Sequence, residues 1–296
     1  MSPADVYRSH SMWTDPGAFA PRLREIPPDP AAVVRGVSGL LLHPMMAPLR
    51  GTVVPPSSLE DRTIRSVEGI LARVLARDGR ELTASRADED RAFCVCAGFA
   101  RVAVAVFRTH GLPVRCRVGF APYFNPGFLE DHWLCEYWTD GAWHLLDAQL
   151  DAETIREAGI AFVPWDVPRD QFVDAPTAWQ RLRAGELDPT RVGLSAFGFS
   201  GAWFVAGNLM LDAAALNKEE MLPWEKWSVG RELGPGAVVP PAWAERLDAV
   251  AARLAGAPDA AVAERVYRES EWLRVTPTVL SFDGDPPVEV PGHPAA

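Results

Sequence analysis

The sequence contains few cysteines and no long apolar run. Four cysteines in 296 residues are too few for a disulfide scaffold, so we expect free thiols in a reducing compartment. No window approaches 18 uninterrupted apolar residues, and the opening residues lack the charged-then-apolar layout of a secretion signal. We therefore expect a cytoplasmic protein that does not enter a membrane.

Clusters of basic residues are also absent. Lys and Arg number 29 against 39 Asp and Glu, which gives a formal net charge of −10. Nucleic acids and anionic membranes attract clustered Lys and Arg, so we expect neither as a partner. The hydrophobic content of 48% is enough for a sizeable buried core in a chain of this length. We therefore expect a folded protein whose chemistry depends on thiols or on a metal.

Proline and turn residues divide the chain into three expected regions. Residues 1–57 are rich in proline and predict an irregular lead-in that packs on the core. Residues 58–151 form the expected core, and residues 152–296 form a mainly helical extension. The spacing of apolar residues predicts helices over 58–77, 152–158, 174–184, about 199–216 and 241–268.

A long apolar helix and three strands follow one another in the expected core. The stretch "AFCVCAGFARVAVAVFRTHG" predicts a helix from Cys96 to about His110 that is apolar on most sides and therefore buried. The residues after it predict strands over 114–121, 131–139 and 142–150. The dipeptide Asp-Gly between the last two strands strongly favours a hairpin with a two-residue loop. We therefore expect an α+β fold.

The expected hairpin places His132 close to Asp147. With the two-residue loop, Leu134 lies opposite Asp147 and His132 lies opposite Gln149. His132 and Asp147 are then diagonal neighbours on one face, about 7–8 Å apart at the backbone, within reach of a side-chain hydrogen bond. The carboxylate would orient the imidazole, as in a catalytic triad. The alternative is a His–Asp pair that only braces the hairpin.

Two cysteines lie at the start of the expected helix. A helix dipole and free backbone N–H groups favour a thiolate at a helix N-terminus and can also donate to an oxyanion. Cys96 has this position, so we predict it as the nucleophile and Cys94 as a bystander. The alternative is a zinc site built from Cys94, Cys96, His132 and Cys135, with Cys116 as a spare. Cys-x-Cys is tighter than the usual ligand spacing, and His132 and Cys135 point to opposite faces of a strand, so zinc is less favoured.

Five motifs together resemble the transglutaminase-like superfamily. They are the Cys96 helix, "GLPVR", "GFAPYF", "EDHWLCEYW" and "WHLLDAQLD". The chain is similar in particular to bacterial transglutaminase-domain proteins common in actinomycetes. Its stretch "ALNKEEMLPWEKW" also resembles the C-terminal region of those proteins. The resemblance covers about residues 88–228. It implies a papain-like domain in which the Cys-bearing helix packs on an antiparallel β-sheet.

The resemblance also implies a catalytic triad and no cofactor. Cys96 would be the nucleophile, His132 the general base and then acid, and Asp147 the orienting residue. The implied reaction is thiol-dependent acyl transfer through a Cys acyl-enzyme: hydrolysis of an amide, peptide or thioester, or amide-bond formation on a small molecule. Val95 and Ala97 flank the nucleophile where cross-linking transglutaminases carry Gln and Trp, so we do not expect protein cross-linking.

Two other functions fit the same motifs. One is a non-catalytic binding module that keeps the fold without turnover. The other is an acyltransferase or cyclase that acts on the thioester of an acyl carrier protein in natural-product biosynthesis. Because an acidic carrier prefers a basic rim, the net charge of −10 favours a small-molecule or peptide substrate.

Four residues near the expected triad are candidates for substrate binding: Trp133, Glu136, Arg115 and Trp143. The tryptophans would form the floor of an acyl pocket, or simply pack in the core. Arg115 would bind a substrate carboxylate or phosphate. Its alternative is a salt bridge to an acidic residue of the following strand, such as Glu136.

Overall fold

The chain folds into two compact units. The computed structural model describes residues 4–280 and 286–292. The first unit contains the chain up to Cys116 and the segment Trp133–Arg169, and the second contains Arg117–His132 and the chain from Asp170 onward. Each unit therefore combines segments that are distant in the sequence.

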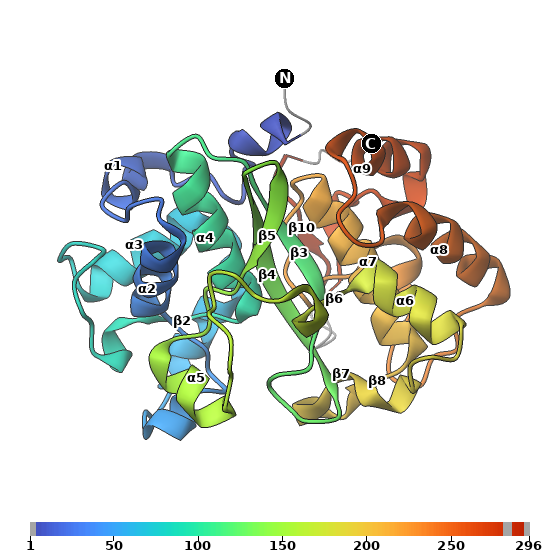
Figure 1. Ribbon diagram of the computed structural model, residues 1–296, viewed down its shortest axis with the longest axis horizontal. Helices are drawn as coiled ribbons and strands as arrows, with labels where there is room; N and C mark the ends of the chain where they lie inside the picture. The colour runs from blue at the N-terminus through green and yellow to red at the C-terminus, as the bar shows by residue number, and fades with distance from the viewer. Residues whose placement is uncertain (1–3, 281–285, 293–296) are drawn as a thin grey trace. The chain divides into compact units, whose positions relative to one another are not determined.

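The first unit is built around one buried helix. It contains α1 (Ala20–Leu23), α2 (Pro30–Leu40), α3 (Val67–Arg77), α4 (Cys96–Thr109) and α5 (Ala152–Ala158). Figure 1 shows α2 and α3 beside α4, and both pack against it. Every residue of α4 except its last is buried, which confirms the predicted buried helix. The helix ends before Gly111, whose φ of +75° lies in the left-handed region that glycine adopts without strain.

Residues 58–77 differ from the single helix expected. A 3₁₀ helix covers Pro56–Thr63, and the α-helix α3 starts only after Ser66. The Ser66 hydroxyl accepts a hydrogen bond from a backbone N–H one turn into α3, so this serine is the cap. Asp61 is fully buried and its carboxylate pairs with Arg77 at 2.6 Å. The Ser58 hydroxyl instead accepts a hydrogen bond from Arg77 at 3.1 Å, so α3 starts only at its own cap, Ser66.

The segment before α1 is held against α4 by a buried arginine. The Arg108 guanidinium donates to the hydroxyl of Thr14 at 2.8 Å and to the carbonyl of Tyr7 at 3.2 Å. It also donates to the carbonyl of Val114 at 3.1 Å. These bonds satisfy a charged group that would otherwise be costly to bury.

A mixed sheet of six strands has the order β6-β3-β4-β7-β8, with β5 paired to β4. The sheet consists of β3 (Val114–Ala121), β4 (Leu129–Thr139), β5 (Ala142–Leu146), β6 (Val173–Asp174), β7 (Val192–Leu194) and β8 (Phe199–Ser200). In the second unit, β3 pairs with β6 in antiparallel orientation and β4 pairs with β7 in parallel. The sheet is therefore mixed, where the resemblance implied an antiparallel one. The helix α6 lies between β6 and β7 in the chain and provides the kind of crossover connection that a parallel strand requires.

The predicted hairpin of the first unit is confirmed. β4 and β5 pair in antiparallel register from Thr139 with Ala142 to Cys135 with Leu146. The loop residues have positive φ values, +50° for the Asp and +79° for the Gly. Both values fit the two-residue turn that the Asp-Gly pair predicts.

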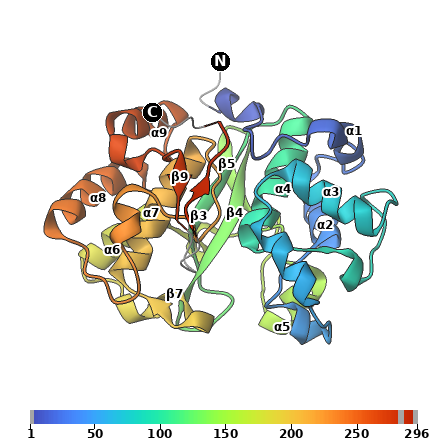
Figure 2. The ribbon, with the colours of Figure 1, turned by 180° about the vertical axis from the view of Figure 1, so that it is seen from behind.

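The second unit is mainly helical outside the sheet. It contains α6 (Ala175–Arg183), α7 (Ala202–Leu216), α8 (Pro241–Leu254) and α9 (Ala260–Glu269), with the short antiparallel pair β9 (Thr278–Val279) and β10 (Val288–Glu289), which Figure 2 shows from behind. The single helix expected over 241–268 is wrong. It is broken between α8 and α9, where Gly256 has a φ of +76° and Pro258 follows.

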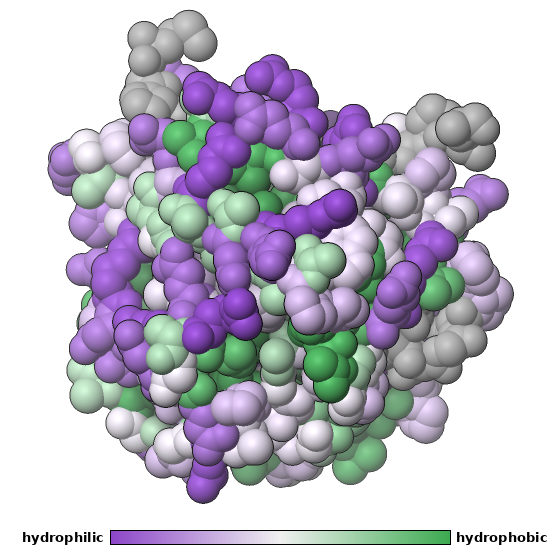
Figure 3. All heavy atoms as spheres, turned by 90° about the vertical axis from the view of Figure 1, so that its right-hand side faces the viewer, coloured by the Kyte–Doolittle hydropathy of each residue, from purple (hydrophilic) through white to green (hydrophobic). Residues whose placement is uncertain are grey.

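One face of the second unit carries many polar side chains. Figure 3 shows hydrophilic side chains over much of one face, with smaller hydrophobic areas between them. Arg183 of α6 pairs with Asp248 of α8 at 3.1 Å, which links two helices at the surface. In the part of the chain that the structure describes, no helix is both long and apolar enough to cross a membrane.

Candidate functional site

Cys96 is the first residue of α4. Before it, β2 (Ala92–Phe93) pairs in parallel with β1 (Leu41–Leu42), and the N–H of Cys94 donates to the Leu42 carbonyl at 3.1 Å. Val95 is extended (φ −81°, ψ 170°) and helical backbone begins at Cys96. The N–H groups of a first helical turn have no partner inside the helix. The Gly98 N–H already donates to the Val95 carbonyl at 2.8 Å, so the N–H groups of Cys96 and Ala97 are the candidate donors to an oxyanion beside the Cys96 sulfur.

Burial separates Cys96 from the other three cysteines. Cys96 is 7% exposed, Cys94 is 2% exposed, and Cys116 and Cys135 are fully buried. Burial raises the pKa of Cys94 to about 12, and it raises the pKa of Cys135 well above its ordinary value. Because the thiolate is the nucleophile, Cys94 and Cys135 react poorly near neutral pH.

The cysteines are free thiols. Across residues 4–280 and 286–292, no group of three or more His, Cys, Asp and Glu side chains is arranged to hold a metal ion. The alternative zinc site therefore has no assembled ligand set in this part of the chain.

His132 lies in β4 and is 1% exposed. In the second unit, two aromatic rings from the connection between β3 and β4 pack on its imidazole. The ring centre of Phe124 is 5.0 Å away and that of Tyr123 is 5.9 Å away, both edge-on. Both residues belong to the motif "GFAPYF", but the sequence did not predict this contact, because spacing does not determine the path of a loop. The rings limit the rotation of the imidazole.

A polar cluster holds the loop that carries these rings. Asn125 donates to the carboxylate of Glu130 at 3.1 Å and to the Ser195 hydroxyl at 3.3 Å. The Ser195 N–H donates to the same carboxylate at 3.0 Å, and the Ser195 hydroxyl also donates to it. These bonds tie the loop to β4 and to the start of the segment after β7.

Asp131, next to His132, is a partly buried carboxyl. Burial raises its pKa to about 7, although a hydrogen bond from Asn208 at 2.6 Å and the charge of His132 act in the opposite direction. In the sequence, its signal is its position directly before the predicted base.

Asp147 follows the last paired residue of β5. The ladder ends at Cys135 and Leu146, one step before the expected pairing of Leu134 with Asp147. It ends there because the N–H of Asp147 donates to the Pro164 carbonyl at 2.8 Å. The Asp147 carboxylate accepts the N–H of Gln149 at 3.0 Å and is 1% exposed. The carboxylate is therefore held in a fixed orientation.

Three of the predicted substrate-binding residues form a cluster in the first unit. Arg115 and Glu136 are both fully buried, and the guanidinium donates to the carboxylate at 2.8 Å. The guanidinium also lies 4.1 Å from the ring centre of Trp143 and 5.5 Å from that of Tyr7. Arg169 pairs with the same carboxylate. This pairing corresponds to the alternative predicted for Arg115, and substrate binding by these residues stays a prediction.

Trp133, the fourth predicted substrate-binding residue, is 1% exposed. Its indole N–H has no hydrogen-bond acceptor among the described residues. Two aromatic residues of α7, Trp203 and Phe204, line a hollow of about 390 Å³, counting its open mouth, in the second unit together with Lys226 and Trp227. Burial lowers the pKa of Lys226, whose ammonium lies 5.5 Å from the ring centre of Trp203.

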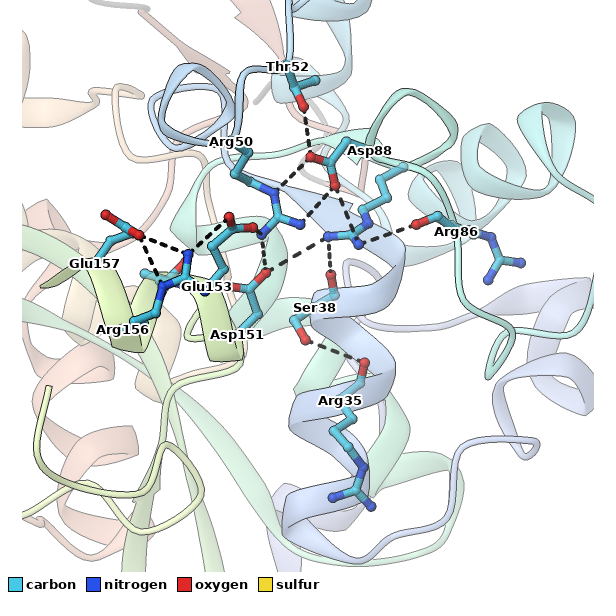
Figure 4. Close-up of polar contacts among 12 residues, drawn as sticks. Arg35, Ser38, Arg50, Thr52, Arg86, Asp88, Asp151, Glu153, Arg156 and Glu157 are labelled. Atoms are coloured by element: carbon cyan, nitrogen blue, oxygen red, sulfur yellow. Dashed lines mark hydrogen bonds and ion pairs between the residues drawn. The ribbon is translucent and has the colours of Figure 1, made fainter. Parts of the chain in front are cut away.

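An ion-pair network in the first unit anchors the segment after Asp147. Figure 4 shows Arg50 pointing between Asp88 and Asp151, with its guanidinium 2.8 Å from the first carboxylate and 2.6 Å from the second. The Thr52 hydroxyl donates to Asp88 at 2.7 Å. The hydrogen bond to Asp88 is the main reason why the pKa of Arg50 is raised. The network joins three segments that are distant in the sequence, and spacing therefore could not predict it.

Comparisons with known proteins give one structural match. No protein-family model and no curated protein sequence matches this chain. The chain is similar to a crystal structure of a candidate cysteine protease from Cytophaga hutchinsonii, with a TM-score of 0.28 and 15% sequence identity. The match covers 59% of this chain and 46% of that protein, so it spans less than half of that protein's length.

Proposed function

We propose that this protein is a thiol-dependent acyl-transfer enzyme of the transglutaminase-like type, with Cys96 as its nucleophile. The observation that carries the proposal is the position of Cys96 as the first residue of a buried helix, where it is the most exposed of the four cysteines. The helix dipole favours a thiolate at this end, and the first-turn N–H groups suit an oxyanion.

In the proposed reaction, Cys96 gives its thiol proton to His132 and the sulfur attacks the carbonyl carbon of an amide or thioester, so that the carbonyl electron pair moves to oxygen. The C=O bond re-forms as the bond to the leaving group breaks, and the leaving group takes the proton from His132. Water or an amine then loses a proton to His132 and attacks the acyl-enzyme, and the C–S bond breaks as the sulfur takes that proton from His132 and leaves as the Cys96 thiol. No cofactor takes part.

Asp147 is the orienting residue of the proposed triad. Its carboxylate is fixed by the N–H of Gln149, which suits a group that orients an imidazole and stabilises its protonated form. Phe124 and Tyr123 support the same role for His132, because their rings restrain the imidazole. The proposed substrate is a small molecule or peptide with an amide or thioester bond.

The test is the pH dependence of iodoacetamide alkylation, mapped by peptide mass spectrometry. We expect Cys96 to be alkylated at pH 6 faster than free cysteine, while Cys94 stays unmodified because of its raised pKa. His132→Ala should slow the alkylation of Cys96 about tenfold at pH 6, because the imidazolium no longer favours the thiolate. A screen of amides and thioesters would follow, with Cys96→Ser as the inactive control.

His144→Ala is the matched control. His144 also lies in the β4–β5 hairpin and pairs with a carboxylate, Asp166 at 3.3 Å, but it is half-exposed. Its removal should leave the alkylation rate unchanged. Equal rates for Cys96 and free cysteine, or an equal effect of both histidine changes, would overturn the proposed triad.

A further inference from the structure

A small hollow lies beside the Cys96 end of α4, entirely within the first unit. Its walls include Leu41, Leu42, Met46, Phe99 and Gln149. It measures about 220 Å³, counting its open mouth. Most of this volume is open to solvent, and the enclosed part has room for about one water-sized polar group.

The hollow is close to two members of the proposed triad. Phe99 is three residues after Cys96 in α4, which places it about 4.5 Å further along the helix axis. Gln149 follows Asp147 by two residues and donates its N–H to the Asp147 carboxylate. A group attached at Cys96 can therefore extend into the hollow.

Gln149 points to the chemistry of the ligand. The residue is 6% exposed, and its side-chain oxygen is buried without a hydrogen-bond partner among the described residues. A buried acceptor that lacks a donor is costly. A ligand N–H or O–H at this position would remove that cost. The apolar walls formed by Leu41, Leu42, Met46 and Phe99 suit an apolar stem.

The charges at the rim favour a neutral ligand group. Asp151 also lines the hollow, but both of its carboxylate oxygens are engaged. One accepts the guanidinium of Arg50 at 2.6 Å, and the other accepts the N–H of Thr154 at 2.8 Å. Figure 4 shows the Asp151 carboxylate facing Arg50. The charge of Asp151 is therefore paired with Arg50, and His43 is the other ionisable residue that lines the hollow.

We propose that this hollow receives the end of a short substrate side chain, a neutral hydrogen-bond donor such as an amide N–H or a hydroxyl, while the apolar stem of that side chain lies in the open mouth. The donor bonds the side-chain oxygen of Gln149, and this end group is not the carbonyl that Cys96 attacks. The inference rests on the proposed function, because the side chain belongs to the acyl donor.

The test uses four iodoacetyl amides that alkylate Cys96 with loss of iodide. Their amine parts are β-alaninamide, 3-aminopropanol, β-alanine and isopentylamine, which end in an amide, a hydroxyl, a carboxylate and an apolar group. We expect one or both neutral donors to label Cys96 about tenfold faster than the carboxylate and apolar probes. Gln149→Met should abolish this preference when the rate of each probe is expressed relative to that of plain iodoacetamide with the same variant.

Gln180→Met is the matched control, since Gln180 is an exposed glutamine on α6. It should behave as the unmodified protein. If the amide probe reacts faster, the ligand's end group is an amide. If the hydroxyl probe reacts faster, the end group is an alcohol. Equal rates for all four probes at a fast-reacting Cys96 would overturn the hollow as a binding site and leave the proposed nucleophile intact. A Cys96 that reacts no faster than free cysteine with any reagent would overturn both proposals.

Discussion

Two cysteines that lie two positions apart have different environments. Cys94 is in an extended segment and its N–H bonds the Leu42 carbonyl, whereas Cys96 is already helical. The sequence could predict this difference, because the apolar spacing placed the start of the helix at Cys96. It could not predict that the Cys94 side chain packs against Gly98 in the first turn of α4.

Gly98→Ala tests this packing. A Cβ at Gly98 would lie 2.7 Å from the Cβ of Cys94 and 3.3 Å from its sulfur. We expect the change to lower the free energy of unfolding by about 1–3 kcal/mol, because overpacking outweighs the better helix propensity of alanine. Urea unfolding measures it. Gly207→Ala in α7 is the control: a Cβ there meets nothing within 4 Å, so it should stabilise by about 0.5–1 kcal/mol. Equal stabilisation by both changes would contradict the packing.

Short sequence patterns predicted individual strands and turns of this fold, but not the contacts between residues that are distant in the sequence. The strand over 114–121 and the hairpin loop follow the prediction, because alternation and the Asp-Gly pair act over a few residues. The pairing of β7 with β4 was not predicted, since it joins residues that are about sixty positions apart. The ring contacts of His132 and the Arg50 network are non-local for the same reason. The positions of Cys96 and His132 on their elements could be predicted, whereas Asp147 lies just past the end of β5, outside the strand expected for it. The surroundings of all three residues could not be predicted.

The ion pair between β3 and β4 provides a second prediction. Arg115 and Glu136 are fully buried, so Arg115→Met leaves the buried Glu136 carboxylate without the charge of Arg115. We expect this change to lower the free energy of unfolding by about 3–5 kcal/mol. The double change Arg115→Met with Glu136→Leu should recover most of this loss, because it removes both charges. Arg169, the other partner of Glu136, is half-exposed and can turn to solvent.

Urea unfolding of the two single variants and the double variant completes this cycle. A substrate-binding role predicts a different pattern. In that case Arg115→Met would leave stability nearly unchanged and would slow turnover of the amide or thioester found in the screen. That pattern would show that the buried pair is not the main role of Arg115.

On the scale of the whole molecule, the excess of acidic residues affects how stability depends on pH. The chain has a formal net charge of −10, and most carboxylates at its surface stay ionised at little cost. Asp131 is different because burial raises its pKa from 3.8 to about 7. Composition alone could not predict this, since the shift depends on the surroundings of one side chain.

Asp131 should therefore make the folded protein less stable as the pH rises. Between about pH 4 and pH 7 the folded state keeps a proton that the unfolded state has lost, so the free energy of unfolding falls by up to about 1.4 kcal/mol per pH unit. The contribution is fully present below pH 4 and is lost by pH 7.

The variant Asp131→Asn cannot ionise and should remove this fall in the free energy of unfolding, whereas Asp170→Asn, which changes an exposed carboxylate, should keep it. Urea unfolding at pH 5, 6, 7 and 8 measures the difference, and parallel profiles for all three proteins would contradict the raised pKa. Because Asp131 precedes His132, the same titration would change the charge beside the proposed base near pH 7.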